Sequence, residues 1–95
     1  FLDHLRFERS LSERTLEAYG HDVVRMAQHA RLLGRSRPAE VTTADLRRFI
    51  LHLKDVGLAP GSIARNLAAI RTYFRFLLGE NQVVEDPSER IETPR

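Results

Sequence analysis

Cysteine and tryptophan are absent from this 95-residue sequence, and lysine occurs once, at Lys54. Without cysteine the chain can form neither a disulfide framework nor a reactive thiolate, so an intracellular, cytoplasmic setting is the expectation. No apolar run approaches the roughly 20 residues of a membrane span, and the N-terminus has no signal-peptide pattern, so no membrane partner is expected. The chain opens at Phe1 instead of methionine, and we expect it to be a domain cut from a longer protein.

The residue patterns of catalytic and metal sites are missing too. The four histidines, at positions 4, 21, 29 and 52, show no i,i+4 pairing and no clustered carboxylates, so no metal ion is expected. No glycine-rich phosphate loop occurs, and packing explains Tyr19 and Tyr73 better than a role as nucleophiles does. We therefore expect no cofactor, no small-molecule substrate and no catalytic residue in these 95 positions.

Hydrophobic periodicity predicts one all-α domain, a compact bundle of four main helices. The expected ranges are 1–9, 13–33, a third helix from the capping signature at 42–45 to about 56, and 60–79, followed by one helical turn at 86–90. Ser12 is the expected N-cap of the second helix, and Gly34, Gly57 and Gly79 are the expected stops. Gly20 costs the second helix up to about 1 kcal/mol relative to alanine unless another element packs close against it.

Each predicted helix has an apolar face. In the first it comprises Phe1, Leu2 and Leu5, and in the second Leu16, Tyr19, Val23, Met26, Ala27 and Ala30. In the third it comprises Leu46, Phe49, Ile50 and Leu53, and in the fourth Ile63, Leu67, Ile70, Phe74, Leu77 and Leu78. The rest of the chain is organised around the fourth helix, because its apolar stripe is the longest.

The fourth helix also has a basic flank, since residues 57–79 hold three arginines and no acidic residue. Away from its apolar stripe lie Ser62, Arg65, Asn66, Thr72 and Arg75, with Arg71 at the edge. Such a flank faces either water or an anion. Arginines exposed in this way are expected to contribute little to folding stability.

Positive charge is concentrated in the body of the chain. Residues 1–79 carry thirteen Lys/Arg and eight Asp/Glu, a net of +5, whereas residues 80–95 carry a net of −3. This asymmetry favours a body that meets a polyanion. Fourteen of the fifteen basic residues are arginine, whose planar fork suits phosphate, although codon bias in a GC-rich genome produces the same excess.

Four spacings together resemble the core-binding domain of tyrosine recombinases, closest to the Xer recombinases and integrases of bacteria. Residues 11–22 (LSERTLEAYGHD) resemble its LS-x-x-T-x-x-x-Y-x-x-D opening, and 45–57 match its third helix. Residues 62–77 (SIARNLAAIRTYFRFL) resemble its S-I-x-R-x-L-x-A-L-R-x-F-Y-x-F-L helix. Asp86-Pro87 with the final Glu92-Thr93-Pro94-Arg95 resembles its exit into a catalytic domain, so a boundary is expected between residues 1–86 and a linker at 87–95.

The resemblance implies a SAM-like bundle of two crossed helical hairpins that forms half of a clamp around duplex DNA, its second and fourth helices facing successive grooves. The catalytic arginines, lysine or histidines and nucleophilic tyrosine of the family would belong to a C-terminal domain not encoded here. Partners would be duplex DNA and other recombinase subunits, which assemble as a tetramer. The expected DNA contacts are Ser12, Arg14, Thr15, His21, Arg25, Ser62, Arg65, Asn66, Arg71 and Thr72.

An alternative function stays open at this point. Tyr73, Phe76 and the first helix also suit a helical protein-interaction module that mediates subunit assembly. The sequence leaves open which DNA site is recognised, and whether the parent resolves chromosome dimers during chromosome partition and cell division, integrates an element or inverts a segment.

Overall fold

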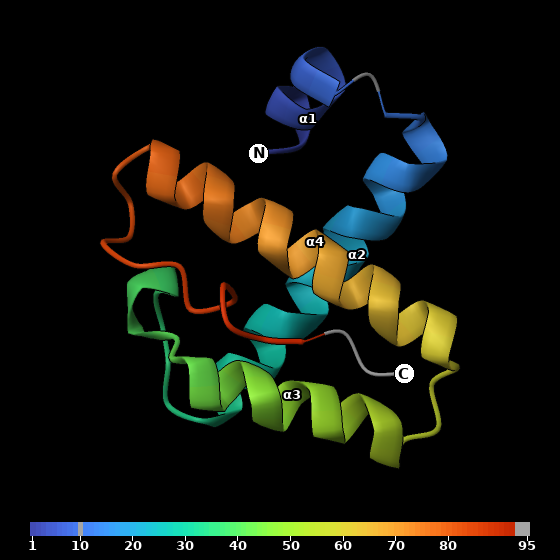
Figure 1. Cartoon of the computed structure of the whole chain (residues 1–95), viewed down its shortest axis with the longest axis vertical. Helices are drawn as coiled ribbons and strands as arrows, with labels where there is room; N and C mark the ends of the chain where they lie inside the picture. The colour runs from blue at the N-terminus through green and yellow to red at the C-terminus, as the bar shows by residue number, and fades with distance from the viewer. Residues whose placement is uncertain (10, 93–95) are drawn as a thin grey trace.

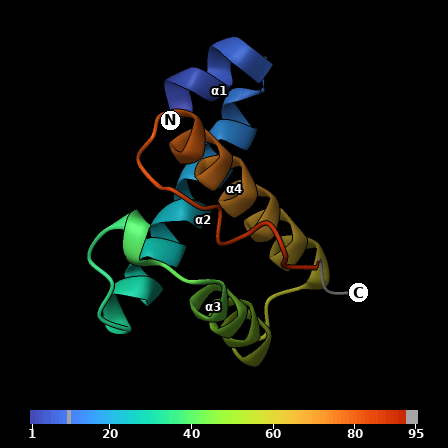
Figure 2. The same ribbon diagram turned by 60° about the vertical axis from the view of Figure 1, so that its left-hand side comes forward.

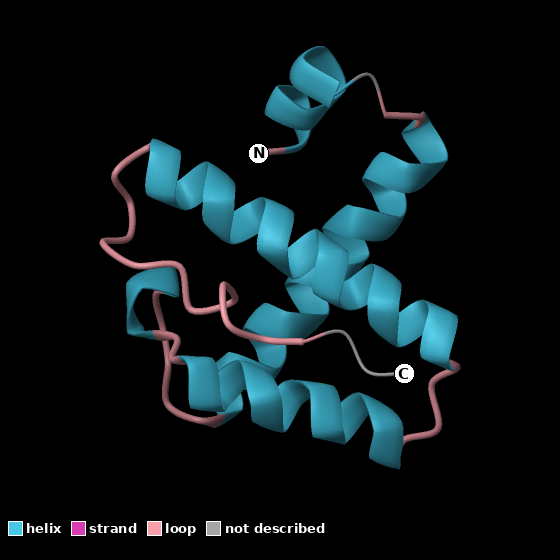
Figure 3. Cartoon of the chain, in the orientation of Figure 1, coloured by secondary structure: helices cyan, strands magenta, loops and turns pink. Residues whose placement is uncertain are grey.

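A computed structural model of the chain describes residues 1–9 and 11–92. Over these residues the chain forms four α-helices and one short 3₁₀ helix, with no strand (Figures 1 and 3). The elements are α1 (Leu2–Arg9), α2 (Glu13–Leu32), the 3₁₀ helix η1 (Pro38–Glu40), α3 (Thr43–Asp55) and α4 (Pro60–Gly79). The predicted all-α class is confirmed. At 86–90 the chain forms i→i+3 turns in place of the predicted helical turn.

Side-chain caps start α2 and α3 as the sequence predicts. The Oγ of Ser12 accepts a hydrogen bond from the N–H of Thr15 at 3.2 Å. At α3 the N–H of Asp45 donates to Thr42 Oγ1 at 3.1 Å, and the N–H of Thr42 donates to Asp45 Oδ2 at 2.9 Å. Each cap satisfies backbone donors that the first helical turn leaves without partners.

The helices end in two ways. Gly34 and Gly57 follow α2 and α3 with φ of +86° and +87°, a left-handed conformation that favours glycine. Gly79, by contrast, is the last residue of α4, and the left-handed position after it belongs to Asn81, with φ of +58°. Asparagine tolerates this conformation better than other residues with a β-carbon do.

Helices α2 and α4 cross near the centre of the fold (Figures 1 and 2). α1 packs against α2, and α3 packs against both α2 and α4. The chain therefore forms two helical hairpins, α1–α2 and α3–α4, crossed against each other as predicted. In the described part of the chain, no helix combines the length and apolar character needed to cross a membrane.

α1 is joined to α2 and α4 by apolar and aromatic contacts. The ring of Phe1 meets that of Tyr73 edge-on, with centroids 5.2 Å apart, and lies 5.6 Å from Phe76. Leu5 is buried, whereas Leu2 remains 37% exposed. A β-carbon on Gly20 would lie 3.3 Å from Cδ1 of Leu2, so this glycine has the close packing partner that its place in a helix requires.

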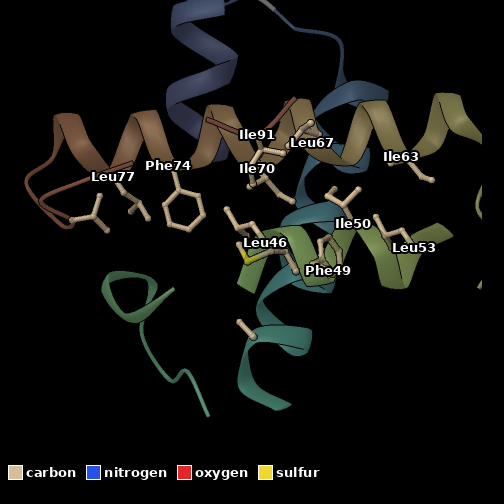
Figure 4. Close-up of a cluster of buried hydrophobic side chains, with 13 residues drawn as sticks. Leu46, Phe49, Ile50, Leu53, Ile63, Leu67, Ile70, Phe74, Leu77 and Ile91 are labelled. Carbon is tan, nitrogen blue, oxygen red and sulfur yellow. The ribbon is translucent and has the colours of Figure 1, made fainter. Parts of the chain in front are cut away.

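The core lies where α3 and α4 pack together with the C-terminal half of α2 (Figure 4). The predicted positions of α3 are all buried, and so are those of α4 except Leu78, which is 41% exposed. On α2, Leu16, Met26 and Ala30 are buried, Tyr19 and Val23 are half-buried and Ala27 is exposed. The inner face of α2 is therefore narrower than predicted, and the prediction was wrong for Ala27 and Leu78.

The segment after α4 returns along the bundle instead of leaving it. Val83 and Ile91, each 6% exposed, complete the core cluster. The Oγ1 of Thr43 donates to the carbonyl of Pro87 at 2.8 Å, and Arg71 Nη2 donates to the carbonyl of Ile91. The packed body of the chain therefore extends beyond residue 86, as far as residue 91. Residues 93–95 of the predicted linker lie outside the described residues.

We predict that Ile91→Ala lowers the free energy of unfolding by about 2–4 kcal/mol, because it leaves a cavity in the core. Val84→Ala, in the same segment but 96% exposed, should change it by less than about 0.5 kcal/mol. Urea denaturation followed by circular dichroism measures both. Equal midpoints for the two variants would show that the segment does not stabilise the bundle.

A histidine pair lies where α2 meets α3. The ring centroids of His29 and His52 are 5.1 Å apart, and the His29 ring lies 5.4 Å from that of Phe49. Burial and the neighbouring His52 lower the pKa of His29 below its ordinary value of 6.5, and the carboxylate of Asp45 opposes this shift only in part. Protonating His29 is therefore less favourable in the folded chain than in the unfolded one.

It follows that the free energy of unfolding falls as the pH drops below about 6.5, because the unfolded state then binds more protons at His29. Above this pH His29 makes no pH-dependent contribution. The wild-type chain should lose more stability between about pH 7.5 and about pH 5.5 than His29→Gln, measured by urea denaturation. His21→Gln, which removes an exposed histidine, is the control. If the free energy of unfolding of His29→Gln depends on pH as that of the wild type does, the pH dependence does not come from His29.

Candidate nucleic-acid interface

A bidentate ion pair joins α2 to α4 near their crossing. Arg65 Nε donates to Asp22 Oδ2 at 2.9 Å, and Arg65 Nη2 donates to Asp22 Oδ1, also at 2.9 Å. The Asp22 side chain is 3% exposed, and that of Arg65 is 46% exposed. The carboxylate is therefore buried and neutralised, while the guanidinium remains partly open to solvent.

Small residues flank this pair on both helices. Ala18 lies one turn before Asp22 on α2, and Ala69 lies one turn after Arg65 on α4. Residues four apart share a helix face, so both alanines face the neighbouring helix. Ala69 is fully buried and Ala18 half-buried. Short side chains at these positions suit a close approach of α2 and α4 beside the ion pair.

The carboxylate also stabilises the charged form of the guanidinium. The hydrogen bond to Asp22 raises the pKa of Arg65 above its ordinary value, and this outweighs the opposing effect of burial. Arg65 therefore stays a cation wherever the chain is folded.

The predicted contacts on α2 lie at its surface. Arg14, His21 and Arg25 are exposed, and their spacing places them on one outward face of the helix. Ser12 is exposed and caps the helix, and its hydroxyl also donates to Oγ1 of the half-buried Thr15 at 2.9 Å. The three basic side chains thus share one face of α2, and the two hydroxyl groups lie at its N-terminus.

Electrostatically, this α2 surface is positive. Among the described residues, Arg14 and Arg25 have no ion-pair partner. His21 Nε2 lies 3.9 Å from Glu17 Oε1, and both side chains are well exposed. Both arginines therefore remain available to an external anion.

On α4 the structure corrects two predicted contacts. Asn66 is fully buried and donates through Nδ2 to the carbonyl of Ser62 at 2.8 Å. Thr72 is 8% exposed, and its Oγ1 donates to the carbonyl of Ala68 at 2.8 Å. The prediction that both side chains lie away from the core was wrong, because neighbouring elements bury α4 beyond its apolar stripe.

The remaining α4 candidates differ from one another. Ser62 is half-buried, one turn before the exposed Arg65. Arg71 is half-buried and binds the carbonyl of Ile91, so it holds the returning C-terminal segment. Arg75, which was not among the expected contacts, is exposed on the same helix.

The aromatic residues of the alternative interaction module are largely used inside the chain. Tyr73 and Phe76 are half-buried, and both rings pack against Phe1 of the N-terminal segment. Among the side chains that the structure describes, no three His, Asp or Glu residues are grouped so that they could hold a metal ion.

Residues 1–81 match the family described as phage integrase, N-terminal SAM-like domain. The chain belongs to this family. It is 38% identical to the tyrosine recombinase XerD of Chlorobaculum tepidum and 35% identical to the tyrosine recombinase XerC of Roseiflexus sp. strain RS-1. Both alignments cover the whole chain, which spans 31% and 30% of these relatives. None of the solved structures matches the chain.

Because this integrase SAM-like domain spans less than a third of these relatives, the rest of their length has no counterpart in these 95 residues. Two of the motifs that resemble the family lie together in the fold, because Asp22 of residues 11–22 binds Arg65 of residues 62–77. Asp22 was not predicted as a site residue. In the sequence, the only sign of its role was that an acidic residue lies beside a basic helix face. The sequence did not indicate which arginine this residue would bind.

In this SAM-like domain, Arg65→Ala should lower the free energy of unfolding by about 1–3 kcal/mol, because Asp22 would stay buried without its cation. This loss of stability is smaller than the loss on breaking a fully buried ion pair, since the Arg65 side chain is 46% exposed. This revises the expectation that Arg65 hardly affects stability. Arg25→Ala is the matched control and should cost less than about 0.5 kcal/mol in urea denaturation. Equal costs would show that the pair does not stabilise the fold.

Proposed function

We propose that this domain binds duplex DNA through the outward face of α2 and the adjoining part of α4. The observation that carries the proposal is an exposed helix face on which Arg14 and Arg25 have no ion-pair partner among the described residues, beside the half-exposed guanidinium of Arg65. Ser12 and Thr15 add hydroxyl groups to this surface. Arginines at such a surface bind backbone phosphates, which supply most of the affinity and fix the register of a protein on DNA.

The proposed role in the parent protein follows from membership of the integrase family. The relatives named above are tyrosine recombinases, and the chain spans less than a third of their length. We infer that the domain forms one half of a clamp around a recombination site and that the absent catalytic domain forms the other half. Other recombinase subunits, assembled as a tetramer on the DNA, and a cytoplasmic setting belong to the same proposal.

Salt titration of DNA binding tests the function. Half a clamp with about four to six phosphate contacts should bind weakly, with little sequence preference and a log–log salt slope of roughly −4 to −5. Arg14→Ala with Arg25→Ala should cost about 1–3 kcal/mol of binding in total and reduce the slope by about 2. Fluorescence anisotropy with a labelled duplex measures both.

Arg47→Ala with Arg48→Ala is the matched control, since it removes the same charge from exposed positions on α3. It should leave affinity and slope nearly unchanged, because exposed charges beyond about 10 Å from the DNA are screened. Equal losses in both double variants would place the interface elsewhere. A wild-type chain that fails to bind at low salt, or binds without salt dependence, would argue against DNA binding.

A further inference from the structure

Arg65 has unused donors on the side facing away from Asp22. A guanidinium carries five N–H groups, and the pair with Asp22 uses the Nε–H and one Nη2–H. Among the described residues Arg65 has no other hydrogen-bond partner. The two Nη1–H groups and the second Nη2–H thus have no partner among the described residues, on a side chain that is 46% exposed.

We propose that Asp22 is a positioning residue that holds the free edge of Arg65 ready for a phosphate of the DNA backbone. The proposal rests on the DNA-binding function proposed above. A guanidinium binds phosphate best through two parallel hydrogen bonds, so its orientation matters as well as its charge. A planar group held on one edge by two hydrogen bonds loses little further freedom when its other edge binds a ligand.

Burial of the carboxylate makes this arrangement compatible with an anionic ligand. Asp22 is 3% exposed, so an approaching phosphate meets the guanidinium and not the carboxylate. The exposed Arg25 lies one turn after Asp22 on α2, and the half-buried Ser62 lies one turn before Arg65 on α4. A cation and a hydroxyl on either side favour an anion at this place.

The proposal predicts the opposite of simple electrostatics. Neutralising Asp22 raises the net charge of the domain by one, and uniform attraction to DNA would then become stronger. If Asp22 instead positions Arg65, the same change weakens binding. The sign of the effect therefore distinguishes the two accounts.

The experiment compares Asp22→Asn with Glu17→Gln in fluorescence anisotropy with a labelled duplex at fixed salt. Both changes remove one negative charge from α2, but Glu17 is exposed and does not contact Arg65. We expect Asp22→Asn to weaken binding by about three- to ten-fold, and Glu17→Gln to leave it unchanged or slightly stronger. In an Arg65→Ala chain, Asp22→Asn should cause no further loss, since its effect passes through Arg65.

Arg65→Lys provides a second measurement, because lysine keeps the charge without the fork. It should weaken binding about as much as Asp22→Asn does. Folding of each variant is checked by urea denaturation. If Asp22→Asn does not fold, Arg65→Lys decides, and wild-type affinity in that variant would overturn the proposal.

Two further results would also overturn the proposal. One is an Asp22→Asn chain that binds DNA as tightly as the wild type does. The other is an Asp22→Asn change that weakens binding as much in the Arg65→Ala chain as in the wild type. Both leave the DNA-binding function intact, because the wild-type chain still binds. Absence of binding by the wild type would instead reject the function, and the positioning role with it.

Discussion

A buried carboxylate needs a cationic partner, and in this domain that requirement sets how α4 crosses α2. Removing a carboxylate from water costs several kcal/mol unless hydrogen bonds and an opposite charge compensate. Asp22 is 3% exposed, and Arg65 supplies both compensations through two bonds of 2.9 Å. Apolar contacts are non-directional and tolerate several crossings. A shift of α4 by one turn, about 5.4 Å, would remove Arg65 from Asp22, so the pair selects a single register.

Asp45 is a second buried carboxylate that needs hydrogen bonds and an opposite charge. Burial alone would raise the pKa of this carboxyl, but hydrogen bonds from Arg35 and Thr42 lower it overall. Asp45 thus completes the N-terminal cap of α3 and, 2.9 Å from Arg35 Nε, also fixes the loop that precedes this helix. Next to this cap, Thr43 binds the carbonyl of Pro87 and secures the returning C-terminal segment. Loop, helix start and C-terminal segment therefore depend on one another.

Local signals predicted the helices well, because caps, stops and apolar periodicity depend on neighbours in sequence. The capping box of Thr42 and Asp45 and the four core positions of α3 are examples. Asn66 and Thr72 were misplaced because their burial depends on elements packed against α4, which no periodicity within α4 reveals. The same limit applies to the site: Asp22 and Arg65 are 43 positions apart, and no pattern along the chain indicates that they pair. Ile91, too, becomes part of the core only through contacts made far from it in sequence.

The structure also bears on why arginine is so frequent in this chain. Codon bias would supply arginine at any basic position without regard to geometry. Three ion pairs nevertheless use the Nε and Nη2 edge of the guanidinium: Arg6 with Glu13, Arg35 with Asp45 and Arg65 with Asp22. Lysine carries its charge on a single nitrogen and cannot present two parallel donors to one carboxylate. At Arg35 and Arg65 the acceptor is buried, so a lysine would leave one carboxylate oxygen with an unmet need for a hydrogen bond. Geometry therefore requires arginine at these two positions, and codon bias is a sufficient explanation only for arginines whose side chains bind nothing within the fold.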